Sequence, residues 1–395
     1  GGEAGPAPVA AQPAPPPATD ALPFDGELAV SEEADFRSAL EALDEGDYAG
    51  AAMLFAQFRE TYPMGPLEPA ALIGEGRALE AQGLACPMRD TVTSPARSRR
   101  RAAFSVRRTK KGALAGFHQK ASDVIVAVPD CQLVTPALSA ALPMVERLAV
   151  AGASRKGEMS VLVTESLSGL DVMVKGGKPV DDALRVELAN IAQGEGLARL
   201  AWGDDVLTLR PPHQQFGTAL VTPPPGAFLQ ATQTGQDALL AGVLEALEGA
   251  KHLADLFAGC GTFALPLAER AKVHAVEGDR AMTAALDKGW RQGQGLRHVT
   301  TEARDLFRNP LLPDELKRFD GAVIDPPRAG AEAQVAELAR ARVPRIAHVS
   351  CNPVTFARDC AQLVAAGYRL DWLRVVDQFR WSTHVELVAA LQLEN

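Results

Sequence analysis

The chain has 395 residues, of which 47% are hydrophobic, and a formal net charge of −9. This length is enough for two or three domains with hydrophobic cores, and no apolar run approaches the ~20 residues of a membrane-spanning helix, so we expect a cytoplasmic protein without membrane association. The five cysteines are too scattered for a disulfide framework, and the negative charge does not exclude a nucleic-acid ligand, because the acidic residues are unevenly distributed.

Acidic residues are concentrated in the first part of the chain. Residues 1–83 hold 15 acidic and 3 basic side chains, a net of −12, so the rest of the chain carries a net of +3. The segment from Arg89 to Lys120 is strongly basic. Such a segment can bind RNA phosphates, and a solvated hairpin face would have the same composition.

The first 30 residues have the composition of a disordered segment. Residues 1–30 are rich in Pro and Ala and contain few large apolar groups, so they cannot bury enough surface to offset the entropy of ordering. The chain begins with Gly rather than Met and shows no signal-peptide pattern, which indicates a processed or truncated start.

Residues 31–84 are predicted to be helical, because Phe36 and Phe55 belong to sets of apolar residues at helical spacing. The run 46–63 resembles a tetratricopeptide repeat, such as those of the TolA-binding cell-division coordinator family. This resemblance implies a protein partner for the segment. A second repeat stops at Gly83 without its second helix, and an ordinary helical hairpin is an alternative interpretation.

Residues 85–225 are predicted to form a β-rich central domain. The segment Thr109–Gly112, between two apolar runs, is typical of a hairpin turn. The predicted strands cover residues 103–108, 113–118, 124–128, 159–165 and 170–175, and a predicted helix covers residues 180–195. The basic segment falls within this domain, which is therefore the candidate surface for RNA contact.

Residues 226–395 show alternating strand and helix patterns, which favour a Rossmann-like α/β domain with a doubly wound, mostly parallel sheet. The predicted strands cover residues 252–257, 272–277, 298–303, 319–324 and 345–349. The predicted helices cover residues 239–247, 282–291 and 331–340. Ligands of such sheets bind beyond the carboxyl ends of the strands, so residues that follow these strands are candidates for a site.

A glycine-rich turn follows the first of these strands. Gly259 and Gly261, in the run Asp255–Phe263, let the backbone approach a ligand, although tight packing would also require them. The next strand ends at Glu277, about 20 residues on, where a carboxylate can bind ribose hydroxyls. No phosphate-binding lysine loop is present, so S-adenosylmethionine, which has a ribose but no phosphate, fits better than a dinucleotide.

Candidate catalytic residues lie at two more strand ends and in a segment near the end of the chain. Asp325 is followed by Pro326-Pro327-Arg328, whose prolines stiffen the turn. Cys351 follows the next strand and is the candidate nucleophile. An inert, buried side chain is the better interpretation of three other cysteines, Cys86, Cys260 and Cys360. His384 and Glu386, two residues apart in an extended segment, are predicted to share a face.

The order of these motifs resembles that of the RNA uridine carbon-5 methyltransferases, which make 5-methyluridine in tRNA and 23S ribosomal RNA. The match runs from about Pro95 to Asn395 and rests on Phe228–Gln230, Asp255–Phe263, Val276–Gly278, Asp325–Gly330, Ser350–Pro353, Thr355, Arg358, Asp359 and His384–Glu386. The resemblance implies an S-adenosylmethionine-dependent enzyme that acts on RNA, and we expect ribosomal RNA rather than tRNA.

The resemblance also implies roles for individual residues. Cys351 is the implied nucleophile, Glu386 the implied general base, and Asp325 a third residue at the reacting centre. Together with Gly259 from the glycine-rich turn, the implied cofactor-binding residues are Gln230, Phe257, Thr262, Glu277, Asp305 and Asp325. Thr262 and Asp305 stand where relatives often carry Asn.

The chain departs from that family in two respects. Many relatives hold an iron–sulfur cluster through four cysteines, of which only Cys131 has a counterpart here, so we expect no cluster and no metal site. An RNA-binding β-barrel found at the front of some relatives is missing, and the helical segment is joined near residue 84 instead. We interpret the chain as a fragment of one protein fused to a truncated methyltransferase.

The predicted function is methylation of carbon 5 of a uridine in RNA, through a covalent cysteine adduct at carbon 6. One alternative is an RNA cytosine-5 methyltransferase, although such enzymes usually place the nucleophile in a different strand-end motif. The other is a non-catalytic tetratricopeptide scaffold fused to an inactive methyltransferase fragment. The presence of Cys351, Asp325 and Glu386 argues against the scaffold.

Overall fold

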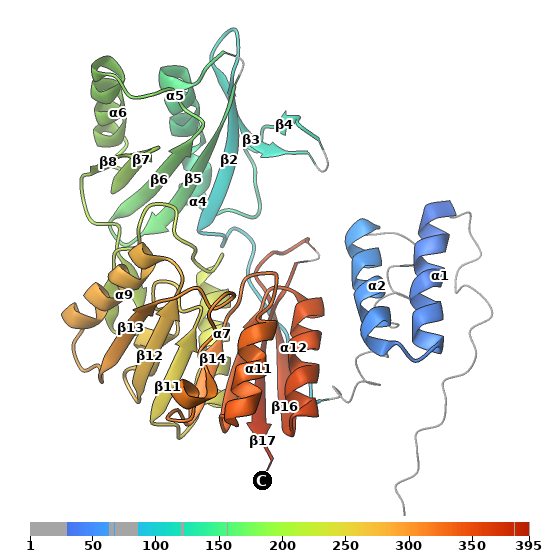
Figure 1. Cartoon of the computed structure of the whole chain (residues 1–395). Coiled ribbons are helices and arrows are strands. Elements are labelled where there is room, and N and C mark those ends of the chain that lie inside the picture. The colour runs from blue at the N-terminus through green and yellow to red at the C-terminus, as the bar shows by residue number, and fades with distance from the viewer. Residues whose placement is uncertain are drawn as a thin grey trace, which may run out of the picture. The chain divides into compact units, whose positions relative to one another are not determined.

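The structure, a computed structural model, describes residues 30–62, 67, 86–119, 122–155, 157–382 and 384–394. The chain divides into two compact units, residues 1–82 and residues 83–395 (Figure 1). Except for Val30, the predicted disordered segment 1–30 lies outside the described residues. The start of the second predicted repeat and its end at Gly83 also lie outside them.

The first unit contains a pair of packed helices, α1 (Val30–Asp44) and α2 (Tyr48–Thr61). The ring of Phe36 on α1 lies 5.7 Å from that of Phe55 and 5.3 Å from that of Phe58, both on α2, measured between centroids. These rings are buried and form the core of the pair. The helical prediction for residues 31–84 therefore agrees with the structure as far as residue 61, and the resemblance to a tetratricopeptide repeat stays a prediction.

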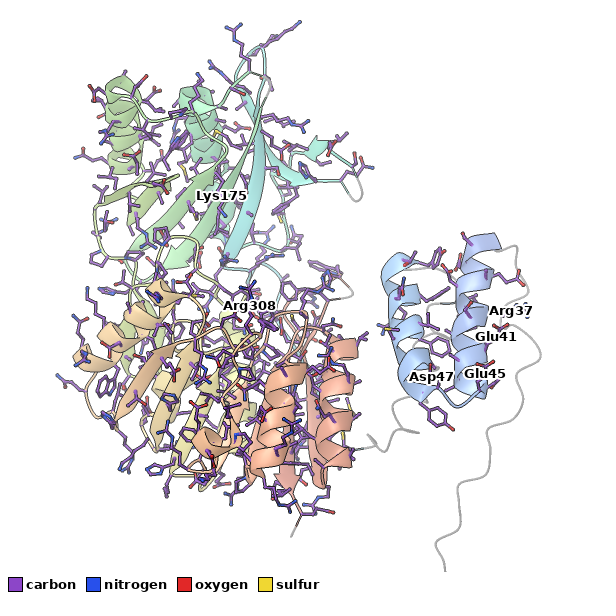
Figure 2. The ribbon with its side chains drawn as sticks, in the orientation of Figure 1. Arg37, Glu41, Glu45, Asp47, Lys175 and Arg308 are labelled. Carbon is purple, nitrogen blue, oxygen red and sulfur yellow. The ribbon has the colours of Figure 1, made fainter. Side chains whose placement is uncertain are left out.

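The outer surface of this helix pair is acidic, as the composition indicates. Glu41, Glu45 and Asp47 are exposed (Figure 2). Asp47 precedes α2, and its side chain accepts a hydrogen bond from the backbone N–H of Gly50 at 2.9 Å. A carboxylate at this position satisfies a backbone donor of the first helical turn and stabilises the start of α2.

The central part of the second unit is a seven-stranded sheet in the order β4-β3-β2-β5-β6-β7-β8, in which only β6 and β7 pair in parallel. Its strands are β2 (Arg101–Arg108), β3 (Ala113–His118), β4 (Ile125–Val126), β5 (Glu158–Ser166), β6 (Gly169–Lys175), β7 (Arg199–Trp202) and β8 (Asp205–Thr208). Three helices accompany the sheet, α4 (Pro136–Ala140), α5 (Leu142–Gly152) and α6 (Asp182–Gly194). Their buried apolar side chains share one core with those of the strands.

The second sheet of this unit has eight strands in the order β1-β16-β17-β15-β14-β11-β12-β13. Its strands are β1 (Val92–Thr93), β11 (His252–Leu256), β12 (Lys272–Glu277), β13 (Val299–Ala303), β14 (Gly321–Ile324), β15 (Arg345–Ser350), β16 (Tyr368–Asp377) and β17 (Glu386–Leu393). Only β17 runs antiparallel to its neighbours. The prediction of a mostly parallel sheet is therefore confirmed.

Helices cover both faces of this sheet. They are α7 (Gln233–Ala246), α8 (Ala264–Leu267), α9 (Arg280–Gln292), α10 (Pro313–Leu316), α11 (Glu332–Ala341) and α12 (Pro353–Ala365). Side chains of α7, α8 and α9 share a core with one face, and α11 and α12 lie over the other face (Figure 1). A short hairpin, β9 (Gln214–Phe216) and β10 (Ala219–Val221), adds to the first of these cores.

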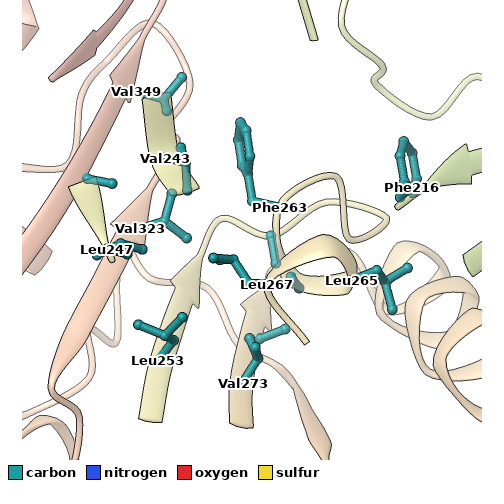
Figure 3. Close-up of a cluster of buried hydrophobic side chains, with 14 of the residues drawn as sticks. Phe216, Val243, Leu247, Leu253, Phe263, Leu265, Leu267, Val273, Val323 and Val349 are labelled. Atoms are coloured by element: carbon teal, nitrogen blue, oxygen red, sulfur yellow. The ribbon is translucent and has the colours of Figure 1, made fainter. Parts of the chain in front are cut away.

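Figure 3 shows part of the core that supports the sheet. Val243 and Leu247 of α7 belong to one buried cluster with Leu253 of β11, Leu265 of α8 and Val273 of β12. Burial of each such side chain contributes roughly 1.5–3 kcal/mol to folding. This packing holds the parallel strands in register, so the positions of their carboxyl ends are fixed.

Candidate active site

The carboxyl ends of the parallel strands surround a cavity of about 480 Å³. Its lining includes the nine residues that the sequence analysis names as catalytic or cofactor-binding, namely Gln230, Phe257, Gly259, Thr262, Glu277, Asp305, Asp325, Cys351 and Glu386. These residues come from segments far apart in the chain. Parallel strands end at the same edge of the sheet, which brings the segments together.

Cys351 and Glu386 become neighbours through the reversed strand β17. Strands β15 and β17 pair so that Ser350 lies opposite Leu387. Cys351 directly follows the first of these residues, and Glu386 directly precedes the second, so the two side chains belong to adjacent positions at the sheet edge. Both line the cavity.

His384 does not share this position, contrary to the sequence-based expectation. Strand β17 begins only at Glu386, so the alternation of a strand does not extend back to His384. His384 is exposed, and its backbone N–H donates to Oγ of Ser382 at 3.2 Å. Glu386 is only 4% exposed. The two residues therefore have different environments, and only the carboxylate lines the cavity.

The turn after β11 has an unusual backbone. Phe257 adopts a φ of 64°, which costs energy for a residue with a side chain and is often found at functional sites. Gly259 has a φ of 56°, and a Cβ atom there would have no neighbour within 4 Å. At Gly261, with a φ of 95°, a Cβ would lie 2.9 Å from Leu286 and 3.0 Å from Leu265. Gly259 thus leaves open space at the cavity, whereas Gly261 permits tight packing.

Glu277 is held in place by the backbone. Its Oε2 accepts a hydrogen bond from the N–H of Gly259 at 2.9 Å, and its Oε1 accepts one from the N–H of Asp279 at 2.9 Å. A carboxylate has about four acceptor positions, so each oxygen can accept a further hydrogen bond. The arrangement presents two fixed acceptors to a ligand with neighbouring hydroxyl groups.

Aromatic side chains line the cavity beside these acceptors. The rings of Phe257 and Phe307 lie 5.3 Å apart between centroids. Asp305 holds this second ring in place, because its Oδ1 accepts hydrogen bonds from the N–H groups of Phe307 at 3.0 Å and Arg308 at 3.3 Å. Phe228, which is 59% exposed, also lines the cavity. Such faces suit a flat heteroaromatic ring.

The acidic groups of the cavity have raised pKa values. Burial raises the pKa of Asp325 to about 7. Burial, and then the negative charge of Asp325, raise the pKa of Glu386 to about 8. Both carboxyl groups therefore titrate near neutral pH. Perturbed carboxyl groups that converge in a cavity are typical of catalytic sites.

Cys351 is the accessible thiol of the cavity. Burial raises its pKa to about 11, the charges of Glu386 and Asp325 act in the same direction, and Arg328 lowers it. The side chain is only half-buried, whereas Cys260, which also lines the cavity, is 1% exposed and has its pKa raised to about 12 by burial. A ligand can therefore reach Cys351 more readily.

The loop after Asp325 is fastened to the loop that carries Cys351. Nδ2 of Asn352 donates to the carbonyl of Arg328 at 3.0 Å, and Oγ1 of Thr355 donates to the same oxygen at 3.3 Å. Oδ2 of Asp359 accepts from the N–H of Ala331 at 2.8 Å. These contacts keep the loop after Asp325 and the loop that carries Cys351 in one fixed arrangement.

Sequence reasoning assigned no role to several residues of the site. Phe228 and Arg328, which the sequence analysis names only as members of motifs, line the cavity, as do Met282 and Phe307. Asp255, at the start of the glycine-rich motif, is fully buried, and among the described residues its carboxylate oxygens have no hydrogen-bond partner. Burial, and then the charge of Asp325, raise its pKa well above the usual range. The signal that the sequence offered for Asp255 was its position in the glycine-rich motif Asp255–Phe263.

The described residues contain no group of three or more His, Cys, Asp or Glu side chains that could hold a metal ion. Cys131, the counterpart of a cluster ligand in the resemblance, is half-buried against the core of the central sheet. Across the same ranges of the chain, none of the helices has both the length and the apolar character needed to cross a membrane.

Comparisons with known proteins find similar chains. The family model described as tRNA (Uracil-5-)-methyltransferase matches residues 295–393. An uncharacterized RNA methyltransferase of Rhizobium meliloti is 46% identical over 316 residues, which cover 80% of this chain and 76% of that protein. A 23S rRNA (uracil(1939)-C(5))-methyltransferase of Thiobacillus denitrificans is 33% identical over 357 residues, which cover 82% of this chain and 81% of that protein.

A solved structure shares the architecture. The tRNA (uracil-54, C5)-methyltransferase of Pyrococcus abyssi, determined in complex with S-adenosyl-L-homocysteine, superposes with a TM-score of 0.61 and 23% sequence identity. The alignment covers 79% of this chain and 82% of that one. At this level of identity the likeness shows a common fold.

Proposed function

Since this chain belongs to the RNA uracil-5-methyltransferase family and is an S-adenosylmethionine-dependent enzyme, we propose that it methylates carbon 5 of a uridine in RNA through a covalent adduct with Cys351. The observation that carries this proposal is the meeting of Cys351, Glu386 and Asp325 in one cavity. A nucleophile and a base are the two groups that this reaction requires.

The chemistry explains why a thiol is needed. Carbon 5 of uracil is a poor nucleophile by itself. Because the pKa of Cys351 is about 11, its thiol must first pass its proton to a carboxylate of the cavity or to water. When the resulting thiolate bonds to carbon 6, the electron pair of the 5,6 double bond moves toward carbon 5, which can then attack an electrophilic methyl group. S-adenosylmethionine supplies that methyl group on a sulfonium. The target base must leave its stack to reach a thiol that is half-buried in a cavity.

Glu386 is assigned to the second half of the reaction. After methylation, carbon 5 bears both the methyl group and a proton. Glu386 removes this proton, the electron pair restores the 5,6 double bond, and the carbon–sulfur bond breaks to release Cys351. A carboxyl group with a pKa of about 8 is a stronger base than an ordinary one, which suits abstraction from carbon.

The cavity residues fit the proposed cofactor. Glu277 offers two fixed acceptors for the ribose hydroxyls, and the rings of Phe257 and Phe307 offer faces for the adenine. Gly259 leaves space that a side chain would fill. We assign the remaining predicted residues, Gln230, Thr262, Asp305 and Asp325, to the same pocket.

We propose 23S ribosomal RNA as the substrate. The support is the relative from Thiobacillus denitrificans, which is named for that activity and aligns over most of both chains. The structural neighbour named for tRNA is less similar in sequence. The basic segment of the central domain is the proposed contact for RNA phosphates, and the proposal includes a cytoplasmic location, where RNA and reduced thiols occur together.

The test of the mechanism is a trapped adduct. Labelled 23S ribosomal RNA is incubated with S-adenosylmethionine and the wild type, Glu386→Gln or Glu386→Gln/Cys351→Ala, and resolved on a denaturing gel. Without the base, elimination cannot proceed, so the single variant should give a shifted band that the double variant lacks. Normal turnover by Glu386→Gln without an adduct would remove Glu386 from the mechanism.

A second experiment tests the base and the RNA. Transcripts of 23S ribosomal RNA and of tRNA are treated in parallel with the wild type, and methylated nucleosides are mapped by mass spectrometry. We expect 5-methyluridine in the ribosomal transcript. A product of 5-methylcytidine would favour the cytosine-5 alternative, methylation of tRNA alone would overturn the choice of substrate, and no methylation of either would favour the non-catalytic scaffold.

A further inference from the structure

A relay of buried polar side chains leads from the start of α7 to the cavity. Gln378 directly follows β16 and is 3% exposed. Its Oε1 accepts a hydrogen bond from the backbone N–H of Thr232 at 3.2 Å, and its Nε2 donates to Oε1 of Gln230 at 2.7 Å. Gln230 is likewise 3% exposed and lines the cavity. The relay therefore ends at a residue of the proposed cofactor pocket.

The chemistry of the relay fixes which amide atom faces the ligand. The two ends of a glutamine amide have nearly the same shape, so their hydrogen-bond partners decide the orientation. The N–H of Thr232 can only donate, so Gln378 must turn its oxygen toward it. Gln378 then has only its NH₂ group for Gln230, which must present its own oxygen in return. The NH₂ group of Gln230 is then left for a ligand.

This remaining NH₂ group is a donor with no acceptor in the part of the chain that the structure describes. There, Nε2 of Gln230 makes no hydrogen bond, although the residue is almost fully buried. Its backbone carbonyl is occupied, because Nε of Arg100 donates to it at 3.3 Å. Gln230 lines the cavity, so a ligand that brings an acceptor there can pair with this donor and gain affinity.

The packing around Gln378 prevents its side-chain amide from rotating to the opposite orientation. A Cβ atom at Gly235 would lie 2.3 Å from Cγ of Gln378, so glycine is needed for the two segments to meet. Thr232 is also fixed, since its Oγ1 accepts from the N–H of Gly235 at 2.9 Å and lies 2.7 Å from Oγ of Ser94. A satisfied buried network of this kind is rigid.

We propose that Gln378 is a positioning residue that fixes the amide of Gln230, so that Nε2 of Gln230 donates a hydrogen bond to an acceptor atom of S-adenosylmethionine. The inference rests on the proposed function, in which this cavity holds the cofactor. Gln378 does not line the cavity, so its effect on the cofactor is transmitted by Gln230.

Two substitutions separate the polarity of the relay from its shape. In Gln378→Glu the ionised carboxylate can accept from Thr232 but cannot donate, so Gln230 must turn its NH₂ group toward it and present oxygen to the cavity. In Gln378→Met the amide of Gln230 is free to adopt either orientation. Titration calorimetry of the full chain with S-adenosylmethionine at pH 8 should give affinities about tenfold weaker for Gln378→Glu and about twofold weaker for Gln378→Met.

Lowering the pH provides a rescue that a purely structural role does not predict. Once protonated, the carboxyl introduced by Gln378→Glu can donate to Oε1 of Gln230 and restore the original orientation. The affinity of this variant, relative to the wild type at the same pH, should therefore recover as the pH falls toward 5. Thermal melting of each variant shows whether it is folded at each pH.

A thermodynamic cycle provides an independent measurement if Gln378→Glu does not fold. If Gln378 acts through Gln230, then Gln378→Met should lower affinity in the wild type but have no effect in a Gln230→Ala background. An equal effect in both backgrounds would overturn the proposal. The proposal would also be overturned if Gln378→Met bound S-adenosylmethionine more weakly than Gln378→Glu at pH 8. The shape of the side chain, rather than its hydrogen-bonding polarity, would then determine the affinity.

Failure of the proposed function gives a different result. If the wild type does not bind S-adenosylmethionine, or if Gln230→Ala binds it as tightly as the wild type, the assignment of the cavity is wrong before Gln378 is considered. If the wild type binds the cofactor and Gln230→Ala binds it less tightly, then the comparison of the two Gln378 variants tests the relay alone.

Discussion

The two sheets of residues 83–395 differ in how they use their strand ends. The eight-stranded sheet, parallel except for β17, brings Phe257, Glu277, Asp325 and Cys351 to one edge, around one cavity. The seven-stranded sheet is antiparallel except for the pairing of β6 with β7, so consecutive strands end at opposite edges. Apolar side chains of its strands form one core with those of α5 and α6.

The difference shows how the topology of a sheet determines whether side chains at its strand ends lie close together. In a parallel sheet every strand leaves toward the same side, so each strand end adds a side chain to one location. In an antiparallel sheet the same number of side chains would be divided between two edges. We therefore expect substitutions at the cavity to alter binding or chemistry, and substitutions of apolar side chains in the core of the central sheet to alter stability alone.

The largest expected effect separates two cysteines, one from each region. Cys351→Ala should lower methyl transfer to RNA at least about a thousandfold, because the nucleophile is lost, while calorimetric affinity for S-adenosylmethionine stays within about twofold. Cys131→Ala, in the central domain, should retain turnover. If Cys351→Ala loses cofactor binding as well, the thiol is structural and the covalent assignment fails.

A smaller side chain in the core of the central sheet tests the expectation that this sheet contributes to stability and not to the chemical step. Leu148 on α5 is fully buried, so Leu148→Ala should lower the free energy of unfolding by about 2–5 kcal/mol. Turnover per folded molecule, measured well below the melting temperature, should change little. A large loss of turnover with full folding would mean that the central sheet takes part in the chemical step rather than supporting it.

Gly259 and Gly203 form a matched pair. Their φ angles are 56° and 59°, and a Cβ atom at either would have no neighbour within 4 Å, but only Gly259 lines the cavity. Leucine at either position should cost about 1–2 kcal/mol of stability from the left-handed backbone. Calorimetry should show cofactor affinity at least about tenfold weaker for Gly259→Leu and unchanged for Gly203→Leu. Equal affinities would mean that the cofactor does not approach Gly259.

Two glutamates should respond to pH with opposite signs. The folded-state pKa of Glu386 is raised to about 8 by burial and then by Asp325, so it reduces stability as pH rises from about 4.5 to 8. Burial acts to raise the pKa of Glu158 on β5, but hydrogen bonds from Ser105 and His118 and the charges of His118 and Arg107 lower it overall, so Glu158 contributes stability above pH 4.5.

The measurement for this pair is thermal melting between pH 3 and pH 9. Relative to the wild type, Glu386→Gln should gain at least about 1 kcal/mol by pH 9, and this gain should disappear as the pH falls below 4.5. Glu158→Gln should lose up to about 1 kcal/mol at neutral pH, because its partners are partly exposed, and should approach the wild type as the pH falls below 4.5. Parallel pH profiles would contradict the assignment of different environments.

Much of the second unit was predictable from local pattern. The predicted strands at residues 113–118 and 272–277 coincide with β3 and β12, and the predicted helix at residues 180–195 contains α6. Apolar alternation and turn residues act over a few residues, so the sequence alone reveals them. Helix α5 and the short strands β9 and β10 were not predicted, because their apolar residues are assigned to a core only once their partners are known.

Residues that line the cavity were also named from the sequence, but their arrangement was not. Motifs at strand ends singled out Cys351, Asp325 and Glu277 because each follows a buried strand. The extended pattern near the end of the chain placed His384 beside Glu386, and the structure separates them, since β17 starts at Glu386. The local pattern could not show where that strand begins.

The sequence by itself determined the types of element, the order of the motifs and the family. Only the tertiary structure decided that β17 inserts in reverse between β15 and β16, which places Glu386 beside Cys351. It also decided that Gln378 reaches Gln230 through a gap left by Gly235. Both contacts join residues far apart in the chain, and such contacts form only when the complete hydrophobic core fixes the strands in register.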